Sequence, residues 1–432
     1  MLNTVWQQAR GLTKDQRNAF IAAYLGWTMD AFDYFLVVLV YSEIADEFHV
    51  SLTDMAFLTT VTLIMRPVGA FVFGLWADKR GRRTPLMVDV LFYSVVGFAC
   101  AFAPNYAVLL VLRLLYGIGM GGEWGLGAAL ALEKIPAEKR GFWSGMLQGG
   151  YSFGYLLAAL AFLFIEPVFG WRGLFAFSLV PALVALFVRS RVGESETWKA
   201  TAKANSTPAR KIFRNPVVLK RFGYLVLLMT AFNLMSHGTQ DVYPTFIKKG
   251  LGMTPTTAIW IAVVYNVGAM LGGPLLGAYS ERFGRRRMIV IAGIAALPIV
   301  PFFAMSRTAG LLALSSFLMQ VCVQGAWGVI PAHLNELSPD AIRGFYPGVT
   351  YQLGNCIAAL NLPLQESIAG HYSYQTALMV TVAPTLVLMI VLTAFGKEAR
   401  GRRFGSEDPP GVASSAPAAP PAAAGGAPAA ST

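Results

Sequence analysis

Charged residues are scarce in this sequence. Only 13% of its 432 residues are Asp, Glu, Lys or Arg, whereas 55% are hydrophobic. A soluble globular protein carries about 25% charged residues, so most of the surface of this chain cannot face water. The scarcity of charge excludes an ordinary soluble domain and favours a lipid bilayer, in which each helical crossing needs about 20 mostly apolar residues.

Cysteine and the motifs of enzymes are also scarce. The three cysteines, Cys100, Cys322 and Cys356, all lie in apolar runs, which excludes a disulfide framework and a metal-ligand spacing. We interpret them as small buried apolar residues. The sequence has no phosphate-binding loop, nucleophile–base constellation or metal cluster, so we expect neither an enzyme nor a cofactor.

The positive charge of the chain follows a membrane pattern. The net charge of +11 could indicate nucleic-acid binding, but most of the 34 Lys and Arg residues cluster between alternate apolar segments. Basic residues gather in this way in the cytoplasmic loops of membrane proteins. The pattern therefore predicts a multi-pass protein of the cell (inner) membrane with both termini in the cytoplasm, and no nucleic-acid partner.

Apolar segments of spanning length recur along the whole chain. Twelve can be distinguished by length and flanking residues, at 19–41, 55–77, 85–104, 107–131, 142–164, 172–190, 222–246, 256–279, 288–306, 309–333, 344–364 and 374–396. They predict an N-terminal bundle over 19–190 and a C-terminal bundle over 222–396. The polar parts are a cytoplasmic N-terminus, 1–18, a cytoplasmic linker, 191–221, and a disordered cytoplasmic tail rich in Ala and Pro, 397–432.

A loop sequence is repeated in the two groups of segments. The loop that starts at Gly74 and the loop that starts at Gly277 both fit the pattern G-x3-[DE]-[KR]-x-G-R-R. Its carboxylates can pair with basic groups or cap a helix N-terminus, and its glycines let helices approach closely. We predict a gating role, with arginines that merely hold the topology as the alternative. The predicted gating residues are Gly74, Asp78, Arg82, Arg113, Glu281 and Arg285.

Few ionisable side chains lie inside the apolar segments. A charge at the centre of a membrane helix costs about 2.5–3.5 kcal/mol unless it finds a partner or a wet cavity, so each is a functional candidate. Asp30 and Asp33 share one helical face in the first segment, and Arg66 lies close to the middle of the second. Arg113 and Glu123 lie in the fourth.

The seventh segment carries a polar face. Asn233, Ser236, His237, Gln240 and Asp241 share an arc of about 140° on a helix, which requires a wet cavity. His237 and Asp241 lie one turn apart, so they can share and pass a proton near neutral pH.

Central amides occur in two further segments. Gln320 and Gln324 lie four residues apart in the tenth segment, and Gln352 and Asn355 lie three apart in the eleventh. A hydrogen bond between helices is the alternative role for each amide. Polar side chains near the middle of the segments are candidates for contact with a substrate, and they include Arg66, Asn233, His237, Gln240, Gln352 and Asn355.

The repeated loop resembles the signature of the major facilitator superfamily. The stretch Arg-Leu-Leu-Tyr-Gly-Ile-Gly-Met-Gly-Gly that begins at Arg113 resembles the second motif of that family. The resemblance covers residues 18–396. It implies an all-α membrane protein whose twelve transmembrane helices form two pseudo-symmetric six-helix bundles, which rock around a central cavity.

The seventh segment is similar to a narrower signature, N-x-x-[ST]-H-x-[ST]-Q-D-x-x-x-T, of the lactate/pyruvate:proton symporters in the sialate:proton symporter family. The stretch from Asp30 to Asp33 and the Q-x-x-N pair of the eleventh segment also resemble this group. The chain matches the signature at Asn233, Ser236, His237, Thr239, Gln240, Asp241 and Thr245. In this family an arginine of the second span and several amides are associated with the carboxylate substrate, and the resemblance carries those roles to Arg66, Gln240, Gln352 and Asn355.

The leading hypothesis is a proton-coupled symporter of a small monocarboxylate of the lactate or pyruvate type, acting as a monomer in the bilayer by alternating access. The proton is the coupling ion. The pair His237 and Asp241 is the first candidate for its carrier, and Asp30, Asp33 and Glu123 are the rivals.

Two alternatives stay open. Another organic acid, sialic or aromatic, is the first, because Glu123 resembles the sialic acid carriers. Those carriers, however, tend to have extra hydrophobic sequence between their halves, whereas 191–221 is too polar to span, which favours a small monocarboxylate. The second alternative is a carboxylate-sensing receptor without net transport, which would need a signalling domain that the sequence does not reveal.

Overall fold

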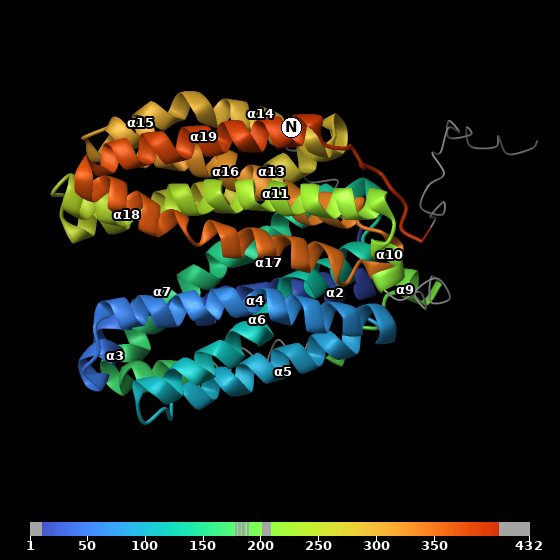
Figure 1. Ribbon diagram of the computed structural model, residues 1–432, viewed down its shortest axis with the longest axis horizontal. Helices are drawn as coiled ribbons and strands as arrows, with labels where there is room; N and C mark the ends of the chain where they lie inside the picture. Colours follow the sequence, from blue (N-terminus) through green and yellow to red (C-terminus); the bar gives the residue numbers. More distant parts are fainter. Residues whose placement is uncertain are drawn as a thin grey trace, which may run out of the picture.

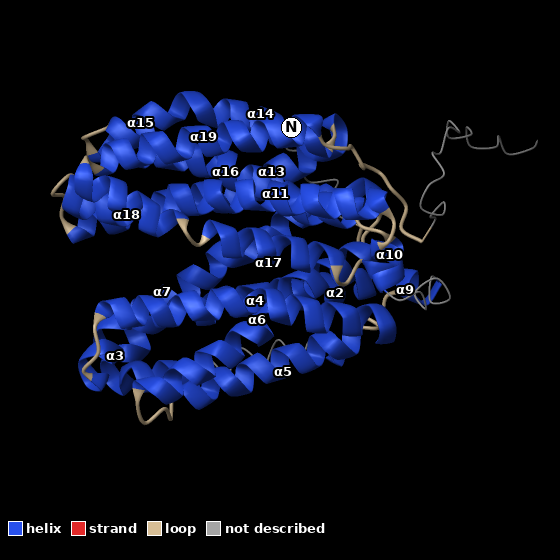
Figure 2. Cartoon of the chain, viewed as in Figure 1, coloured by secondary structure: helices blue, strands red, loops and turns tan. Residues whose placement is uncertain are grey.

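Every regular element of the described chain is helical (Figure 2). The computed structural model describes residues 11–177, 179, 183, 186, 187, 190–200 and 209–405. Ten helices within these residues are long and apolar enough to cross a membrane, so the predicted all-α membrane fold is confirmed. Helices suit this environment because they satisfy their backbone hydrogen bonds internally, where no water is available.

The N-terminal half runs back and forth in long helices (Figure 1). Its elements are α2 (Lys14–Leu39), α3 (Tyr41–Phe48), α4 (Leu52–Arg80), α5 (Arg83–Cys100), α6 (Tyr106–Lys134), the 3-10 turn η1 (Ala137–Lys139) and α7 (Arg140–Phe177). The short helices α9 (Glu196–Ala200) and α10 (Ala209–Phe213) follow between the halves. We call the end of the bundles at which α9 and α10 lie the linker end, on the right in Figure 1, and the opposite end the far end.

The C-terminal half repeats the arrangement with more interruptions. Its elements are α11 (Pro216–Gln240), α12 (Tyr243–Thr245), the π-helical turn η3 (Phe246–Gly250), α13 (Pro255–Phe283), α14 (Arg285–Ala296), the 3-10 turn η4 (Leu297–Ile299), α15 (Val300–Met305), α16 (Ala309–Leu337), the 3-10 turn η5 (Asp340–Ile342), α17 (Tyr346–Ala358), α18 (Asn361–His371) and α19 (Tyr374–Phe395).

Several expected segments differ from the helices of the structure, and the ninth, for example, is interrupted by η4 between α14 and α15. The fifth segment and the start of the sixth form one element, α7, which bends at Gly170 where the backbone turns to φ 62° and ψ −175°. The eleventh is broken between α17 and α18, so neither piece reaches spanning length by itself. The seventh begins earlier than expected, because the side chain of Asn215 accepts a hydrogen bond from Val217 N and Pro216 follows at the first helical position.

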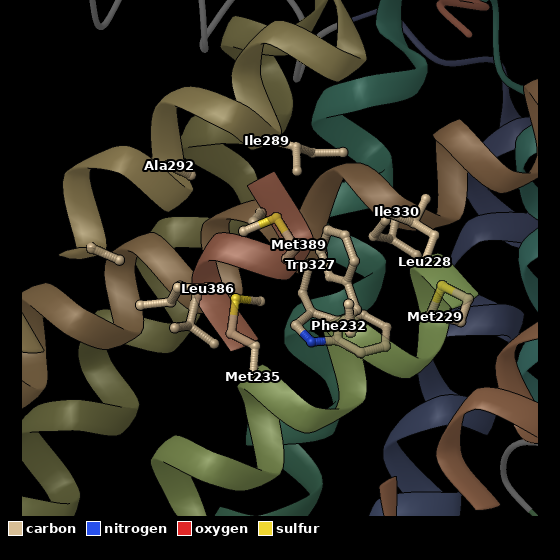
Figure 3. Packing of buried hydrophobic residues seen from close by; sticks show 14 of the residues in the cluster. Leu228, Met229, Phe232, Met235, Ile289, Ala292, Trp327, Ile330, Leu386 and Met389 are labelled. Carbon is tan, nitrogen blue, oxygen red and sulfur yellow. The ribbon is translucent and has the colours of Figure 1, made fainter. Parts of the chain in front are cut away.

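The core of the C-terminal half is a continuous apolar cluster. Phe232 of α11 packs edge-to-face on Trp327 of α16, with ring centroids 5.5 Å apart. Side chains from α14 and α19 close the same cluster, including Ile289 and Met389 (Figure 3). The buried aromatic and sulfur-containing side chains hold these four helices as one rigid body.

The two halves meet along helices from each side. α7 packs on α13, and α17 packs on α4 and α6. The contact is close because glycines face one another: a Cβ added to Gly145 would lie 2.0 Å from the carbonyl oxygen of Gly273. Any side chain at Gly145 would therefore push the halves apart at this point.

The segment after α19, residues 396–405, lies across the linker end, and we call it the C-terminal strap. The Arg400 guanidinium donates to the carbonyls of Glu281 and Arg282 at 3.2 and 2.7 Å. Arg402 donates to the carbonyls of Glu336 and Ser338 at 2.9 and 3.0 Å. The first nine residues of the expected disordered tail, 397–405, thus have defined contacts, whereas 406–432 lie outside the described residues.

Phe404 joins the strap to both halves. Its ring lies between two guanidiniums, with the Cζ atoms of Arg140 and Arg343 at 3.7 and 3.9 Å from the ring centre. Arg140 begins α7 of the N-terminal half, and it also donates to the Arg402 carbonyl at 3.0 Å. Arg343 belongs to the C-terminal half, so the ring bridges the two halves.

Replacing the ring of Phe404 should loosen the linker end. Each cation–π contact contributes about 0.5–2 kcal/mol, so Phe404→Ala should raise the population that is open at this end several-fold. The measurement is the rate at which a thiol reagent labels Ala70→Cys, a position buried between α4 and α17, in a variant without the three native cysteines. Phe395→Ala is the control, because Phe395 is 88% exposed. Equal labelling rates in the two variants would contradict a bridging role of the ring.

Candidate functional site

A buried ion pair lies at the middle of the N-terminal half. Nη2 of Arg66 in α4 is 2.8 Å from Oδ2 of Asp30 in α2, and the two side chains are 4% and 0% exposed. Nε of Arg66 has no hydrogen-bond partner among the described residues. Because a guanidinium can bind a carboxylate through two parallel hydrogen bonds, Arg66 retains donors for a second acid.

Tyrosines from both halves surround this guanidinium. Tyr34 of α2, Tyr151 of α7 and Tyr351 of α17 all interact electrostatically with Arg66. Tyr351 also stacks at a tilt on Trp124 of α6, with ring centroids 4.5 Å apart. These tyrosines are not among the residues predicted from the sequence, although a hydroxyl inside an apolar segment is a signal that could have indicated them.

The polar face of α11 lies in the other half. Nδ1 of His237 is 2.9 Å from Oδ2 of Asp241, and Nε2 is 3.0 Å from Oδ1 of Asn355 in α17. Both partner atoms are hydrogen-bond acceptors, so a ring protonated on both nitrogens satisfies both contacts. The side chains of His237 and Asp241 are 24% and 31% exposed, and the pair can therefore exchange protons with water.

The ion pair with its tyrosines and the polar face of α11 interact across the boundary between the halves. His237 interacts electrostatically with Arg66, and Asp241 interacts with Tyr34 and Tyr151. The structure thus brings together Asp30 and Arg66 of one half with His237, Asp241 and Asn355 of the other.

Gln352 is a buried amide without a partner. It lies in α17, is 1% exposed, and neither of its amide atoms has a hydrogen-bond partner in the described part of the chain. A buried polar group that stays unpaired costs about 1–3 kcal/mol. A polar ligand in the space between the halves would remove that cost.

The other predicted amides are partly committed within the C-terminal half. Gln240 donates to Ser236 Oγ at 3.1 Å and to Gln320 Oε1 at 3.3 Å, so it links α11 to α16. Asn233 donates to the carbonyl of Met229 in its own helix at 2.8 Å. The contact of Gln240 with α16 is the hydrogen bond between helices that is the alternative role of these amides, whereas the contact of Asn233 stays within α11.

Three ionisable residues lie away from this space, inside the N-terminal half. Arg113, one of the predicted gating residues, donates to Sγ of Cys100 at 3.3 and 3.0 Å and lies over the ring of Tyr116, so its described contacts are inside the N-terminal half and not with the repeated loops. Asp33 lies beside Gly97 and Tyr116. Glu123 is fully buried, and one of its carboxylate oxygens lies near Gly127 of its own helix.

The repeated loop closes the linker end. Asp78, in the last turn of α4, accepts hydrogen bonds from Gly344 N and Phe345 N at 2.7 and 3.0 Å, directly before α17 of the other half. Arg82 holds that carboxylate at 2.6 Å. A Cβ at Gly74 would lie 2.7 Å from Cα of Phe345, which explains the glycine.

The second copy of the loop makes the equivalent contact in the opposite direction, from the C-terminal half to the N-terminal half. Glu281 of α13 accepts a hydrogen bond from Gly141 N at the start of α7, and it binds Nη2 of Arg285 at 2.8 Å. Each half therefore caps a helix of the other with its own carboxylate, and the helix dipole favours this placement.

Two further glutamates connect the halves. Glu336 of α16 binds Arg285 of its own half at 2.9 Å and Arg140 of the other at 3.2 Å. Glu133 of α6 binds Arg82 of its own half at 3.2 Å and lies 3.6 Å from Arg343 of the other. All four arginines and both glutamates are buried or nearly so, so the charges depend on one another.

The sequence contained a signal for these residues. The fourth apolar segment and the loop after it contain Trp-Gly, a later Glu and then Arg-Gly-Phe. The tenth segment and the loop after it contain the same residues at the same spacing. The two sets are Trp124, Glu133 and Arg140, and Trp327, Glu336 and Arg343, which are separated by the same number of residues as Asp78 and Glu281.

The sequence matches the Major Facilitator Superfamily over residues 19–240 and 226–426. A carboxylic acid transporter protein homolog of Saccharomyces cerevisiae is 29% identical over 391 residues, which are 84% of this chain and 63% of the yeast protein, so this chain spans less than two thirds of that relative. The sialic acid transporter NanX of Escherichia coli is 25% identical over 396 residues, or 91% of this chain and 96% of NanX.

Solved structures of the same architecture exist. The proton:xylose symporter XylE, bound to 6-bromo-6-deoxy-D-glucose, superposes with a TM-score of 0.76 and 18% identity, covering 90% of this chain and 98% of XylE. At this identity the likeness establishes the fold and nothing finer.

The ion pair between Asp30 and Arg66 should stabilise the fold. Removing one member of a buried pair costs about 3–5 kcal/mol because the other charge is left uncompensated. Asp30→Asn should therefore lower the thermal unfolding midpoint in detergent, and adding Arg66→Gln should restore part of it. Asp15→Asn is the control, because Asp15 is 56% exposed in its pair with Lys134 and such surface pairs contribute at most about 1 kcal/mol. Additive losses in the double variant would contradict the coupling.

Proposed function

Because this multi-pass membrane protein belongs to the Major Facilitator Superfamily and is a transporter by family rather than an enzyme, we propose that it is a proton-coupled symporter of a small monocarboxylate of the lactate or pyruvate type. The observation that carries the proposal is the buried guanidinium of Arg66, with free donors, facing the pair of His237 and Asp241 across the two halves. A cation for the substrate and a proton carrier thus share one space.

The substrate carboxylate binds Arg66. In the structure, Asp30 occupies one edge of the guanidinium at 2.8 Å, so a second carboxylate would use the remaining donors or displace Asp30. The unpartnered amide of Gln352 binds the hydroxyl or keto oxygen beside the carboxylate. Protonation of Asp30 would weaken its hold on Arg66, which makes Asp30 the rival proton carrier within the site.

The proton is carried by His237 and Asp241. The ring of His237 contacts two acceptor oxygens, which suits the protonated form, and the cation adds to the positive charge that attracts a carboxylate. Loss of the proton leaves an acceptor nitrogen, to which Asn355 can turn its amide donor. Substrate and proton therefore favour each other, and the coupling is reciprocal.

Alternating access follows from the closed linker end. The contacts of Asp78, Glu281 and the strap fasten that end, while the polar face of α11 is partly exposed, as expected for a carrier that is open at its far end. The basic loops support an inner-membrane protein whose linker end and termini face the cytoplasm and which acts as a monomer. The N-terminal half to residue 190 and the C-terminal half from 222 are the rocking bodies.

Another organic acid is the second candidate substrate. The rings of Tyr34, Tyr151 and Tyr351 around Arg66 could stack against a planar aromatic acid. A receptor that binds a carboxylate without moving it is distinguished by the same measurement as the main proposal, since only a transporter accumulates labelled substrate inside a vesicle.

The coupling test uses purified protein in vesicles with labelled lactate and an inward proton gradient. The native protein should accumulate lactate above equilibrium. Asp241→Asn should abolish accumulation but retain exchange of lactate across the membrane, because exchange needs rocking of the loaded carrier and no net release of a proton. Asp46→Asn, the same change at an exposed position of α3, is the control and should accumulate normally. Accumulation by both Asp241→Asn and His237→Ala would place the proton elsewhere, with Asp30 as the next variant to test.

The selectivity test uses Gln352→Ala. Losing a paired polar contact in a buried site costs about 1–3 kcal/mol, so the variant should lose most of the preference for lactate over propionate, which lacks the hydroxyl. The measurement is the ratio of initial uptake rates at low concentration. Gln365→Ala is the control, because the Gln365 amide is committed to the Gly238 carbonyl and Thr381 at 2.9 and 2.8 Å. An equal loss for both acids in Gln352→Ala would show that its amide only supports the fold.

A further inference from the structure

A basic cavity lies outside the central site, at the turn between α13 and α14. Its volume is about 430 Å³. The turn connects two membrane-spanning helices at the linker end, and the start of the strap forms its other wall. The lining residues are Arg282, Phe283, Gly284, Arg286, Arg287, Glu398 and Arg400.

Among the described residues that line this cavity, the one carboxylate, Glu398, is occupied by backbone donors. Oε2 of Glu398 accepts from Arg286 N, and Oε1 accepts from Ala399 N and Arg400 N, each at 3.0 Å. Burial opposes its ionisation, but these backbone N–H groups outweigh burial and lower the pKa of Glu398. The carboxylate therefore caps α14 in its charged form, and the four guanidiniums retain an excess of positive charge.

The guanidiniums of this cavity have more N–H donors than their contacts within the described protein use. Arg286 uses Nη2 on the carbonyl of Ala394, and Arg400 uses Nη1 on the carbonyls of Glu281 and Arg282. Arg282 and Arg287 have no ion pair or hydrogen bond from their side chains to any described residue, and both are exposed. A phosphate group accepts several such N–H groups at once and matches the planar fork of arginine.

The position of the cavity indicates which kind of molecule would carry the phosphate group. Phe283, at the end of α13, is 46% exposed beside the arginines, so an apolar surface adjoins the cationic one. A lipid presents the same combination at the boundary of the bilayer, with a phosphate in the headgroup and acyl chains below it. Basic pockets at the ends of spanning helices are suited to such headgroups.

We propose that this cavity binds the phosphate headgroup of an anionic membrane phospholipid. Bound there, the lipid contacts both the turn after α13 and the start of the strap, because Arg400 belongs to the strap and Arg282 to the turn. The site is separate from the central space that holds Arg66, and its occupation does not depend on the identity of the transported substrate.

The test is a binding titration on the full-length protein in detergent. A fluorescent short-chain phosphatidylglycerol is compared with the matching phosphatidylcholine. Each basic residue near an anionic lipid strengthens binding about fivefold, so Arg282→Gln with Arg287→Gln should weaken phosphatidylglycerol binding about 25-fold. Phosphatidylcholine should bind weakly to both proteins. Retention of the native affinity for phosphatidylglycerol in the double variant would overturn the proposal.

Two controls separate the cavity from general charge and from free phosphate. Lys79→Gln with Arg80→Gln removes the same charge from the equivalent, exposed turn of the N-terminal half and should leave phosphatidylglycerol binding unchanged. Arg282→Lys with Arg287→Lys should retain part of the affinity, which also verifies that changes at these positions preserve the fold. Inorganic phosphate at millimolar concentration should fail to displace the lipid; full displacement would identify the cavity as a site for soluble phosphate and overturn the lipid assignment.

Discussion

At the linker end, each half caps a helix of the other and shares buried ion pairs with it. These contacts are the constraint on which the rest of the structure depends. Asp78 of one half caps the start of α17 in the other, and Glu281 returns the contact at α7. Glu133 and Glu336 each receive an arginine from their own half and face one from the other. Buried charges are stable only while they are paired, so the halves can separate here only when water or another partner replaces every contact. The energy of opening is thus concentrated in one layer, and the helices beyond it can move as rigid bodies.

The central site inherits its geometry from this closed layer. α4 and α17 meet at the linker end, and the same two helices carry Arg66 and Asn355 farther along. Fastening the helices at one end sets how far the guanidinium stands from His237. The charged residues of the central site and the contacts at the linker end are therefore linked without touching each other, because α4 and α17 contribute residues to both. Such a shared element is what a carrier needs for occupancy to influence which end is open.

Local patterns predicted the helices and the repeated loop, and the proposed capping role of Asp78 describes the contact that the structure contains. The patterns could not specify which helices would meet. Asp30 and Asp33 stand on one broad face of α2, yet the angle between them directs one to Arg66 and the other toward Tyr116 inside the same half. The sequence predicts Arg113 as a gating residue, but in the structure its guanidinium binds Cys100 inside the N-terminal half. The tyrosines and the paired glutamates act through contacts between distant segments, which local patterns cannot specify. Hydroxyls inside apolar segments are the signal for the tyrosines, and the repeat spacing of the two halves is the signal for the glutamates.

The C-terminal strap ties the architecture of the protein to the order of its synthesis. A ribosome delivers residues 396–405 only after all the spanning helices of both halves have emerged. Phe404, which lies between a guanidinium of each half, is thus among the last described residues to reach the membrane. A nascent chain can bury its apolar helices and pair Arg66 with Asp30 while the strap contacts at its linker end are still missing. Synthesis of the strap then supplies these contacts, so that the linker end is fully fastened only in a molecule that has been made through to residue 405.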